Sequence, residues 1–254
     1  MMVDTIDISA RCQSDARIPR AAVQGGALIA LLCVAAASAS YALAGVSGGT
    51  QPVLAAALTL ALCLAGGGVT LWGLGQRRLY PHTHLGLGNV ITLTRGAGIF
   101  VLAGQIVIDP SGPNWIFAAI ALALLLLDGL DGWAARRARL ASPLGARVDV
   151  ETDVAFALTL AALAVASGQV GLWFLALGLL RPGYLLAQRL WPRLNHPLPD
   201  AQWRRSMAAV QMGAQVVLIS PLLRPEIAVW AGALLLGVML ASFGRDLHWL
   251  ARRR

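Results

Sequence analysis

The sequence predicts an all-α integral membrane protein with about eight transmembrane helices. Of its 254 residues, 57% are apolar and only 13% are charged, whereas soluble domains carry about 25% charged residues. Apolar runs of the length needed to cross a bilayer, about 20 residues, recur along the whole chain. Arginines gather between these runs, as expected of loops that border a membrane.

Each apolar run is interpreted as one membrane helix. The first run exceeds 20 residues and a second follows closely, which favours a helix over a cleaved signal peptide. No internal repeat divides the chain, so the helices form one membrane body with a tail at 1–20, a linker at 79–88 and a basic tail at 251–254. The candidate spans are Ala21–Leu43, Gln51–Leu74, Asn89–Ile108, Asn114–Arg136, Leu144–Ser167, Val170–Gln188, Ser206–Leu222 and Ile227–Leu247.

The arginines also predict the orientation. All 20 basic residues are arginine and the net charge is +8. Loops on one side of the predicted bundle carry most of them, whereas the loops at 45–50, 109–113, 168–169 and 221–226 hold only Arg224. By the positive-inside rule, we expect a multi-pass protein of the inner cell membrane with both termini in the cytoplasm. This placement explains the basic charge without a nucleic-acid partner.

Other candidate ligands carry less weight. Cys12, Cys33 and Cys63 have no metal-binding spacing and are odd in number, so we interpret them as incidental. His82 and His84 in the linker could bind a metal, but an interfacial position favours ordinary surface residues.

Acidic residues concentrate where the fourth span ends and the fifth begins. Asp128 and Asp131 are three residues apart, and Asp149 and Asp153 are four apart, so each pair lies on one helix face. Glu151 points elsewhere and is interpreted as solvated or paired with an arginine. A solvated loop is the alternative, but carboxylates are costly near a bilayer, and a divalent cation would relieve their repulsion. We therefore predict a metal site.

The hairpin between the two pairs contains further signals. Ser142 followed by Pro143 is typical of a helix N-terminus. Gly132 and Gly145 would permit either close helix packing or the approach of a ligand. Arg136 could hold a phosphate bidentately beside the metal, which suggests a diphosphate substrate.

These residues resemble a known signature. The segment from Asp128 to Arg136, then Gly145, Asp149 and Asp153, is similar to the pattern D-x2-D-G-x2-A-R-x8-G-x3-D-x3-D of the CDP-alcohol phosphotransferase family. All eight fixed identities are present. The resemblance covers about residues 86–250 and implies a six-helix core in 89–250, preceded by two additional helices in 21–78.

The resemblance implies roles for individual residues. Two metal ions, magnesium or manganese, would be held by Asp128, Asp131 and Asp149, with Asp153 near the second ion and acting as general base. The stretch Asn89-x2-Thr92-x2-Arg95 resembles the segment that lines the family's nucleotide pocket. The implied contacts to the CDP part of the donor are Asn89, Thr92, Gly132, Arg136, Ser142 and Gly145.

The implied reaction takes place at the cytoplasmic face. An acceptor hydroxyl attacks the β-phosphorus of a CDP-alcohol, most often CDP-diacylglycerol, and CMP leaves. The family also implies a homodimer.

The acceptor is inferred from arginines. Arg181 and Arg189 are spaced as in phosphatidylglycerophosphate synthases, although Pro182 replaces the usual acid. Arg147 could complete an anion pocket with them, and glycerol 3-phosphate is the best candidate acceptor. The alternative for Arg189 is that it marks the membrane border.

Two other classes of membrane protein also use acidic residues on helices. A membrane prenyltransferase would carry two separate aspartate motifs, whereas this chain has one cluster with a built-in Gly-x2-Ala-Arg. A divalent-cation transporter would need acidic residues deep in several helices, and the other spans lack them.

Overall fold

The computed structural model describes residues 19–108, 112–138, 142–191 and 202–252, with side chains left out at 130–138, 202–205 and 251–252. Within this part the eight predicted helices are present, which confirms the all-α class. They are α2 (Arg20–Val46), α3 (Pro52–Leu74), α4 (Leu87–Gly104), α5 (Trp115–Ala138), α6 (Pro143–Ala166), α7 (Leu175–Leu190), α8 (Gln202–Ile219) and α9 (Pro225–Arg252), with 3-10 turns η1 (Gln105–Ile108) and η2 (Leu172–Phe174).

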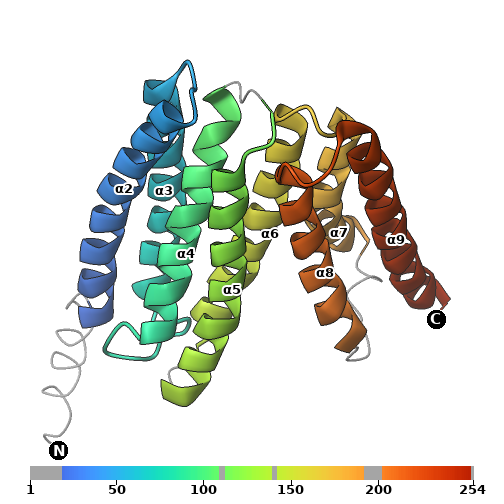
Figure 1. Ribbon diagram of the computed structural model, residues 1–254. Coiled ribbons are helices and arrows are strands. Elements are labelled where there is room, and N and C mark those ends of the chain that lie inside the picture. The colour runs from blue at the N-terminus through green and yellow to red at the C-terminus, as the bar shows by residue number, and fades with distance from the viewer. Residues whose placement is uncertain (1–18, 109–111, 139–141, 192–201, 253–254) are drawn as a thin grey trace, which may run out of the picture.

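The helices stand side by side and alternate in direction (Figure 1). The α2–α3 hairpin packs on α4, and α4 packs on α5 and α6. Helix α6 also contacts α7 and α8, while α9 contacts α7 and α8 at the far end of the bundle. The beginning of α2, the end of α5, the beginning of α6 and the end of α9 therefore lie at the same end of the bundle.

Four segments are long and apolar enough to cross a membrane by length and composition. They are Arg20–Val46, Pro52–Leu74, Leu87–Ile108 and Pro225–Leu250, and shorter apolar helices cover Trp115–Gly129 and Ser206–Ile219. Charged side chains interrupt the apolar stretches of α5 and α6, because these helices carry the acidic residues singled out by the sequence. Several apolar helices of this kind identify a multi-pass membrane protein.

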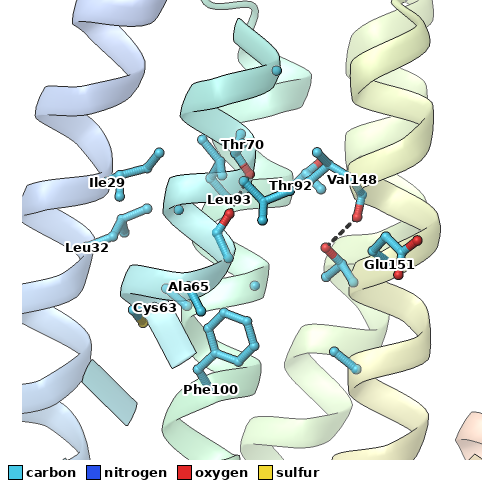
Figure 2. Close-up of a pocket in the computed structure, with 18 of the residues that line it drawn as sticks. Ile29, Leu32, Cys63, Ala65, Thr70, Thr92, Leu93, Phe100, Val148 and Glu151 are labelled. Atoms are coloured by element: carbon cyan, nitrogen blue, oxygen red, sulfur yellow. Dashed lines mark hydrogen bonds between the residues drawn. The ribbon is translucent and has the colours of Figure 1, made fainter. Parts of the chain in front are cut away.

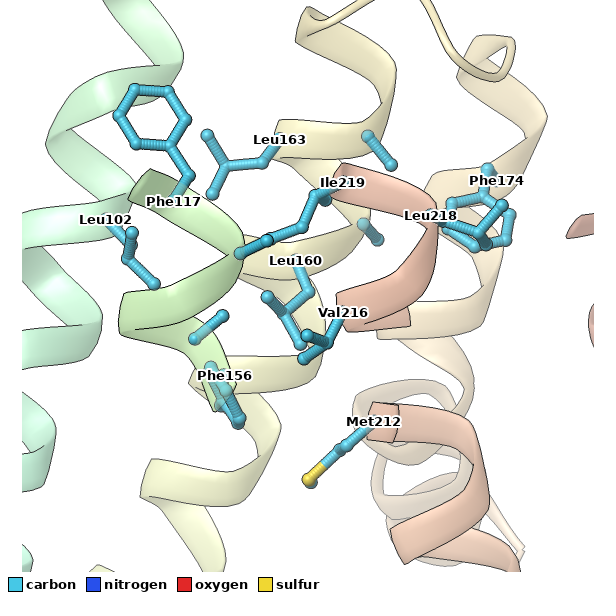
Figure 3. Packing of buried hydrophobic residues seen from close by; sticks show 14 of the residues in the cluster. Leu102, Phe117, Phe156, Leu160, Leu163, Phe174, Met212, Val216, Leu218 and Ile219 are labelled. Carbon is cyan, nitrogen blue, oxygen red and sulfur yellow. The ribbon is translucent and has the colours of Figure 1, made fainter. Parts of the chain in front are cut away.

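The main core forms around α6 (Figure 3). Phe156, Leu160 and Leu163 of α6 are at most 3% exposed, and they pack in one cluster with Phe117 of α5 and Ile219 of α8. Helix α6 also packs against α4 and α7, so it lies at the centre of the bundle. The position of α6 is thus fixed by packing along its second half.

A buried polar cluster joins the α2–α3 hairpin to α4. The side-chain amide of Gln105 donates to the Ser40 hydroxyl oxygen at 2.9 Å, and the Thr59 hydroxyl lies 2.9 Å from the same oxygen. Gly104 permits this approach, since a Cβ there would lie 2.6 Å from the Ala55 carbonyl oxygen. The hairpin is therefore locked to α4 by specific contacts as well as by apolar packing.

Candidate functional site

Three of the four predicted metal ligands converge. Asp128 comes from α5, and Asp149 and Asp153 come from α6. One carboxylate oxygen from each lies within 4.8 Å of the others. The side chains are 39%, 44% and 27% exposed, respectively, so Asp153 is the most enclosed. The side chain of Asp131 lies outside the described residues.

Arg95 of α4 lies at the centre of this carboxylate cluster. Its guanidinium forms ion pairs with all three acids: one nitrogen contacts Asp128, and the other lies 3.0 Å from Asp149 Oδ1 and 3.1 Å from Asp153 Oδ1. Arg95 is only 2% exposed. A planar guanidinium with five donors suits several carboxylates at once, so Arg95 ties α4, α5 and α6 together at the site.

Arg95 closes the Asn89-x2-Thr92-x2-Arg95 stretch, but the sequence alone did not assign it a separate role. The available signal was its setting, because it is the sole charged residue between Asn89 and Ile108. An arginine inside a membrane helix costs about 2.5–3.5 kcal/mol on insertion scales unless it is paired. That cost alone predicts an acidic partner, and the neighbouring aspartates were the obvious candidates.

The first turn of α6 is capped by protein groups. Ser142 has extended backbone angles and its Oγ accepts from the Gly145 N–H at 3.0 Å, as predicted for an N-cap. Pro143 at the first helical position has no N–H to satisfy. The Leu144 N–H donates to the Leu79 carbonyl at 3.0 Å. The N–H groups of the first turn, which have no partner within the helix, therefore bind Ser142 and Leu79. These two hydrogen bonds hold the beginning of α6 against the 79–88 linker.

Asn89 and Gly145, two of the residues expected to contact CDP, touch each other. A Cβ at Gly145 would lie 2.9 Å from Asn89 Oδ1 and 3.3 Å from Ser142 Oγ. Glycine at 145 thus allows the beginning of α4 to approach the beginning of α6. This close approach is one of the two uses that the sequence left open for this glycine.

Tyr80 holds Asn89 in place. The Asn89 side-chain amide donates to the Tyr80 hydroxyl at 3.2 Å, and that hydroxyl donates to the His84 carbonyl at 2.7 Å. The same oxygen accepts from the Gly86 N–H at 3.2 Å. Tyr80 is 2% exposed. The linker between the hairpin and the core therefore supports the site, which the sequence did not indicate.

The remaining CDP candidates are only partly described. Thr92 lies one turn after Asn89 on α4 and is buried, and its hydroxyl donates to the Gly88 carbonyl at 3.0 Å. Gly132 and Arg136 both belong to α5, but the surroundings of Gly132 and the side chain of Arg136 lie outside the described part of the chain.

The three acceptor candidates do not share one face. Arg147 precedes Asp149 by two residues, which corresponds to about 200° around a helix, and it lines a cavity on the other side of α6. Glu151 is exposed on that side as well. Arg181 and Arg189 are exposed on α7, which packs against α6.

The carboxylate cluster fits a divalent cation. Carboxylate oxygens are the hard ligands that magnesium and manganese prefer. Three carboxylates facing one guanidinium leave two formal negative charges. Within the described part of the chain, Asp128, Asp149 and Asp153 are the residues that could hold such an ion.

A comparison with protein families decides what kind of protein carries this site. The sequence model of the CDP-alcohol phosphatidyltransferase family matches residues 85–241, more than half of the chain. The chain belongs to the CDP-alcohol phosphatidyltransferase family. No curated protein and no solved structure showed a significant match.

Membership assigns the chain to the transferases that move a phosphatidyl group from a CDP-alcohol in phospholipid synthesis. The matched region contains the three described aspartates, Arg95 and Asn89. Helices α2 and α3 precede it. The match gives no support to the prenyltransferase or transporter interpretations.

Proposed function

We propose that this phosphatidyltransferase uses CDP-diacylglycerol as donor and a phosphorylated alcohol, best represented by glycerol 3-phosphate, as acceptor, with release of CMP. The convergence of Asp128, Asp149 and Asp153 around buried Arg95 carries the proposal. We also propose an inner-membrane location with the carboxylate cluster facing the cytoplasm, which the arginine distribution supports. A homodimer remains a prediction from the family resemblance.

The acids would hold two magnesium or manganese ions, with Asp131 as a further ligand. When bound, these ions neutralise the diphosphate and stabilise the leaving phosphate oxygen. Asp153, the most enclosed of the three described carboxylates, accepts the proton of the acceptor hydroxyl. The hydroxyl oxygen then forms a bond to the β-phosphorus, and the bond between that phosphorus and the oxygen of CMP breaks.

We assign the nucleotide of the donor to the place where α4 and α6 begin, next to the carboxylate cluster. Asn89, with its amide fixed by Tyr80, and the capped turn at Ser142 and Gly145 present polar atoms at the level where the helices begin. Arg136 and Gly132 of α5 complete the proposed CDP contacts.

The acceptor phosphate is assigned to Arg181 and Arg189 of α7. Arg181 lies within the helix, where an arginine needs a partner or a cavity, and no described carboxylate forms an ion pair with it. An anionic acceptor would supply the missing charge. Arg147 was a third candidate. It projects from the opposite side of α6 to Asp149, so we do not include it among the residues that bind the acceptor phosphate.

The test is CMP release from CDP-diacylglycerol by the purified full chain, with an acceptor screen and identification of the lipid product. EDTA should abolish release, and magnesium or manganese should restore it. Asp128→Asn and Asp149→Asn should raise the metal concentration needed, whereas Asp153→Asn should still bind the donor but lose about 10²–10⁴ in rate. Activity in metal-free buffer would refute the proposed site.

The acceptor assignment has its own test. Arg181→Gln should raise the KM for glycerol 3-phosphate far more than the KM for the CDP-lipid. Turnover only with uncharged or zwitterionic alcohols would show that Arg181 does not bind an acceptor phosphate.

A further inference from the structure

The α2–α3 hairpin brings two cysteines together in its interior. The sequence contains no motif that connects Cys33 of α2 with Cys63 of α3. In the structure both belong to one apolar cluster, they are 4% and 6% exposed, and their thiols are hydrogen-bonded to each other. Neither takes part in a disulfide, and Cys12, the third cysteine, lies outside the described residues. The fold therefore gives Cys33 and Cys63 a relationship that their spacing did not predict.

The packing of the hairpin sets the separation of the two cysteines. Helices α2 and α3 are antiparallel neighbours. A Cβ at Gly67 would lie 3.7 Å from the Ile29 Cβ, and the cysteines follow one turn later, forward along α2 and back along α3. Beyond them the Ser40 and Thr59 hydroxyl oxygens are 2.9 Å apart. Disulfides need Cβ atoms about 3.5–4.5 Å apart, so the helices approach as closely as a disulfide requires one turn away from the cysteines.

Both cysteines lie at the midpoint of a membrane helix. Cys33 is the central residue of α2, which has 27 residues, and Cys63 is the central residue of α3, which has 23. Each thiol is therefore about 16–20 Å along the helix from either end, in segments long and apolar enough to cross a bilayer. An oxidant that acts at this depth must dissolve in hydrocarbon and must accept two electrons and two protons. Membrane quinones have both properties.

A cavity of about 540 Å³ between the α2–α3 hairpin and helices α4 and α6 is lined by both cysteines. Its wall also includes Val69 and Trp72, which are 69% and 65% exposed, so it opens toward the surrounding lipid. Figure 2 shows Cys63 and Phe100 together at one end of this cavity. The volume falls within the range of small-molecule sites, about 300–1,000 Å³. A flat apolar ring can therefore reach the thiols from the bilayer, beside Phe100.

We propose that Cys33 and Cys63 form a dithiol site that a membrane-soluble quinone oxidises to a disulfide. The bond between the two Sγ atoms forms, both S–H bonds break, and the two electrons and two protons pass to the quinone, which leaves as the quinol. An added dithiol reverses the reaction by thiol–disulfide exchange. Helices α2 and α3 lie outside the family match, and the site requires no part of the proposed function. The bond closes the hairpin covalently at the middle of the membrane.

The experiment counts thiols in the full chain, carrying Cys12→Ser, after reconstitution into phospholipid vesicles. The vesicles receive a short-tailed quinone whose ring positions are all substituted, so that it oxidises thiols without adding to them. Denaturation in SDS and a polyethylene-glycol maleimide then reveal each remaining thiol as a gel shift. The reduced protein should take two labels and the quinone-treated protein none, and dithiothreitol should restore both.

Variants with a single thiol test whether the two cysteines react as a pair. Cys33→Ala and Cys63→Ala should each keep their one label after quinone treatment, because one thiol cannot close the bond. Loss of that label, or retention of both labels by the native pair, would overturn the proposed site.

A matched control moves one thiol away from the contact. Leu64 follows Cys63 but is 58% exposed and points about 100° further around α3, so a chain with Cys63→Ala and Leu64→Cys keeps two thiols at the same depth. This chain should retain both labels, and loss as fast as in the native pair would show that the contact between Cys33 and Cys63 plays no part. Glutathione disulfide should oxidise the native pair more than about tenfold more slowly than the quinone, because a charged peptide enters hydrocarbon at high cost. Equal rates for the two oxidants would overturn the route through the membrane.

Discussion

Arg95 determines the charge balance of the carboxylate cluster. Its guanidinium is buried and reaches acids on two other helices, so a single side chain holds three carboxylates that would otherwise repel one another. Removing one partner of such an arrangement leaves the others uncompensated. The partial exposure of the aspartates reduces this penalty, because water screens their charges.

The first prediction concerns this residue. Arg95→Leu should lower the rate of CMP release by about 10–100-fold, as expected for a group that orients metal ligands, and should lower the Tm of the purified protein. Arg95→Lys keeps the charge but loses the two-nitrogen fork, so it should retain the fold and part of the activity. Wild-type rate and Tm in Arg95→Leu would contradict the role assigned to the ion pairs.

Tyr80 gives a second prediction at the same scale. Tyr80→Phe removes the hydroxyl that accepts from Asn89, and an unsatisfied buried polar group costs about 1–3 kcal/mol. We expect the KM for the CDP donor to rise by about tenfold, with a smaller change in kcat. Tyr41→Phe is the control, since Tyr41 is 53% exposed on α2. A fall in kcat alone would mean that Tyr80 does not position the donor contact.

Among the elements, α6 has the most constrained position. Its beginning is fixed by the Ser142 cap and by the Leu79 carbonyl, and its second half is fixed in the main core by Leu160 and Leu163. Asp149 and Asp153 lie between these two sets of contacts along α6. Their position along the bundle axis, relative to α4 and α5, is therefore fixed from both ends of the helix.

The junction of α4 with the hairpin gives the third prediction. Gly104→Ala places a Cβ 2.6 Å from the Ala55 carbonyl oxygen, and overpacking of this kind costs about 1–3 kcal/mol. The Tm should therefore fall, although alanine is the better helix former. Gly237→Ala of α9, where no atom lies within 4 Å of the Cβ, should leave the Tm unchanged or raise it. Equal Tm values for the two variants would show that the hairpin is not closely packed on α4.

The sequence predicted local features well, because they depend on spacing. The eight helices follow from apolar runs, the start of α6 follows from Ser142 and Pro143, and the shared face of Asp149 and Asp153 follows from helical periodicity. Contacts between distant segments were not predictable in this way. The hydrogen bonds from Tyr80 and the cavity behind Thr92 depend on how the hairpin packs against the core, and no local pattern specifies that packing.

At the scale of the whole molecule, the hairpin and the matched core form one packed body. The Ser40–Gln105 contact joins them toward one end of the bundle, and the cluster of Ala21, Leu74, Tyr80 and Leu144 joins them toward the other. The cavity that Arg147 lines lies between these two joints. The hairpin is therefore more than an added anchor, because it forms one wall of a cavity that α4 and α6 close on the other side.

The order of the helices along the chain makes the Arg95 ion pairs relevant to how the protein is made. During synthesis α4 emerges before α5 and α6, so Arg95 must enter the membrane before its acidic partners exist, at a cost of about 2.5–3.5 kcal/mol. A nascent chain that stops after α4 should integrate this helix less completely than one that continues through α6, as measured by glycosylation of engineered sites in the flanking loops. Arg95→Leu should remove the difference, whereas equal integration of both wild-type lengths would show that the later helices do not assist α4. The residue that unites the finished site would then also make the biogenesis of α4 depend on helices that follow it.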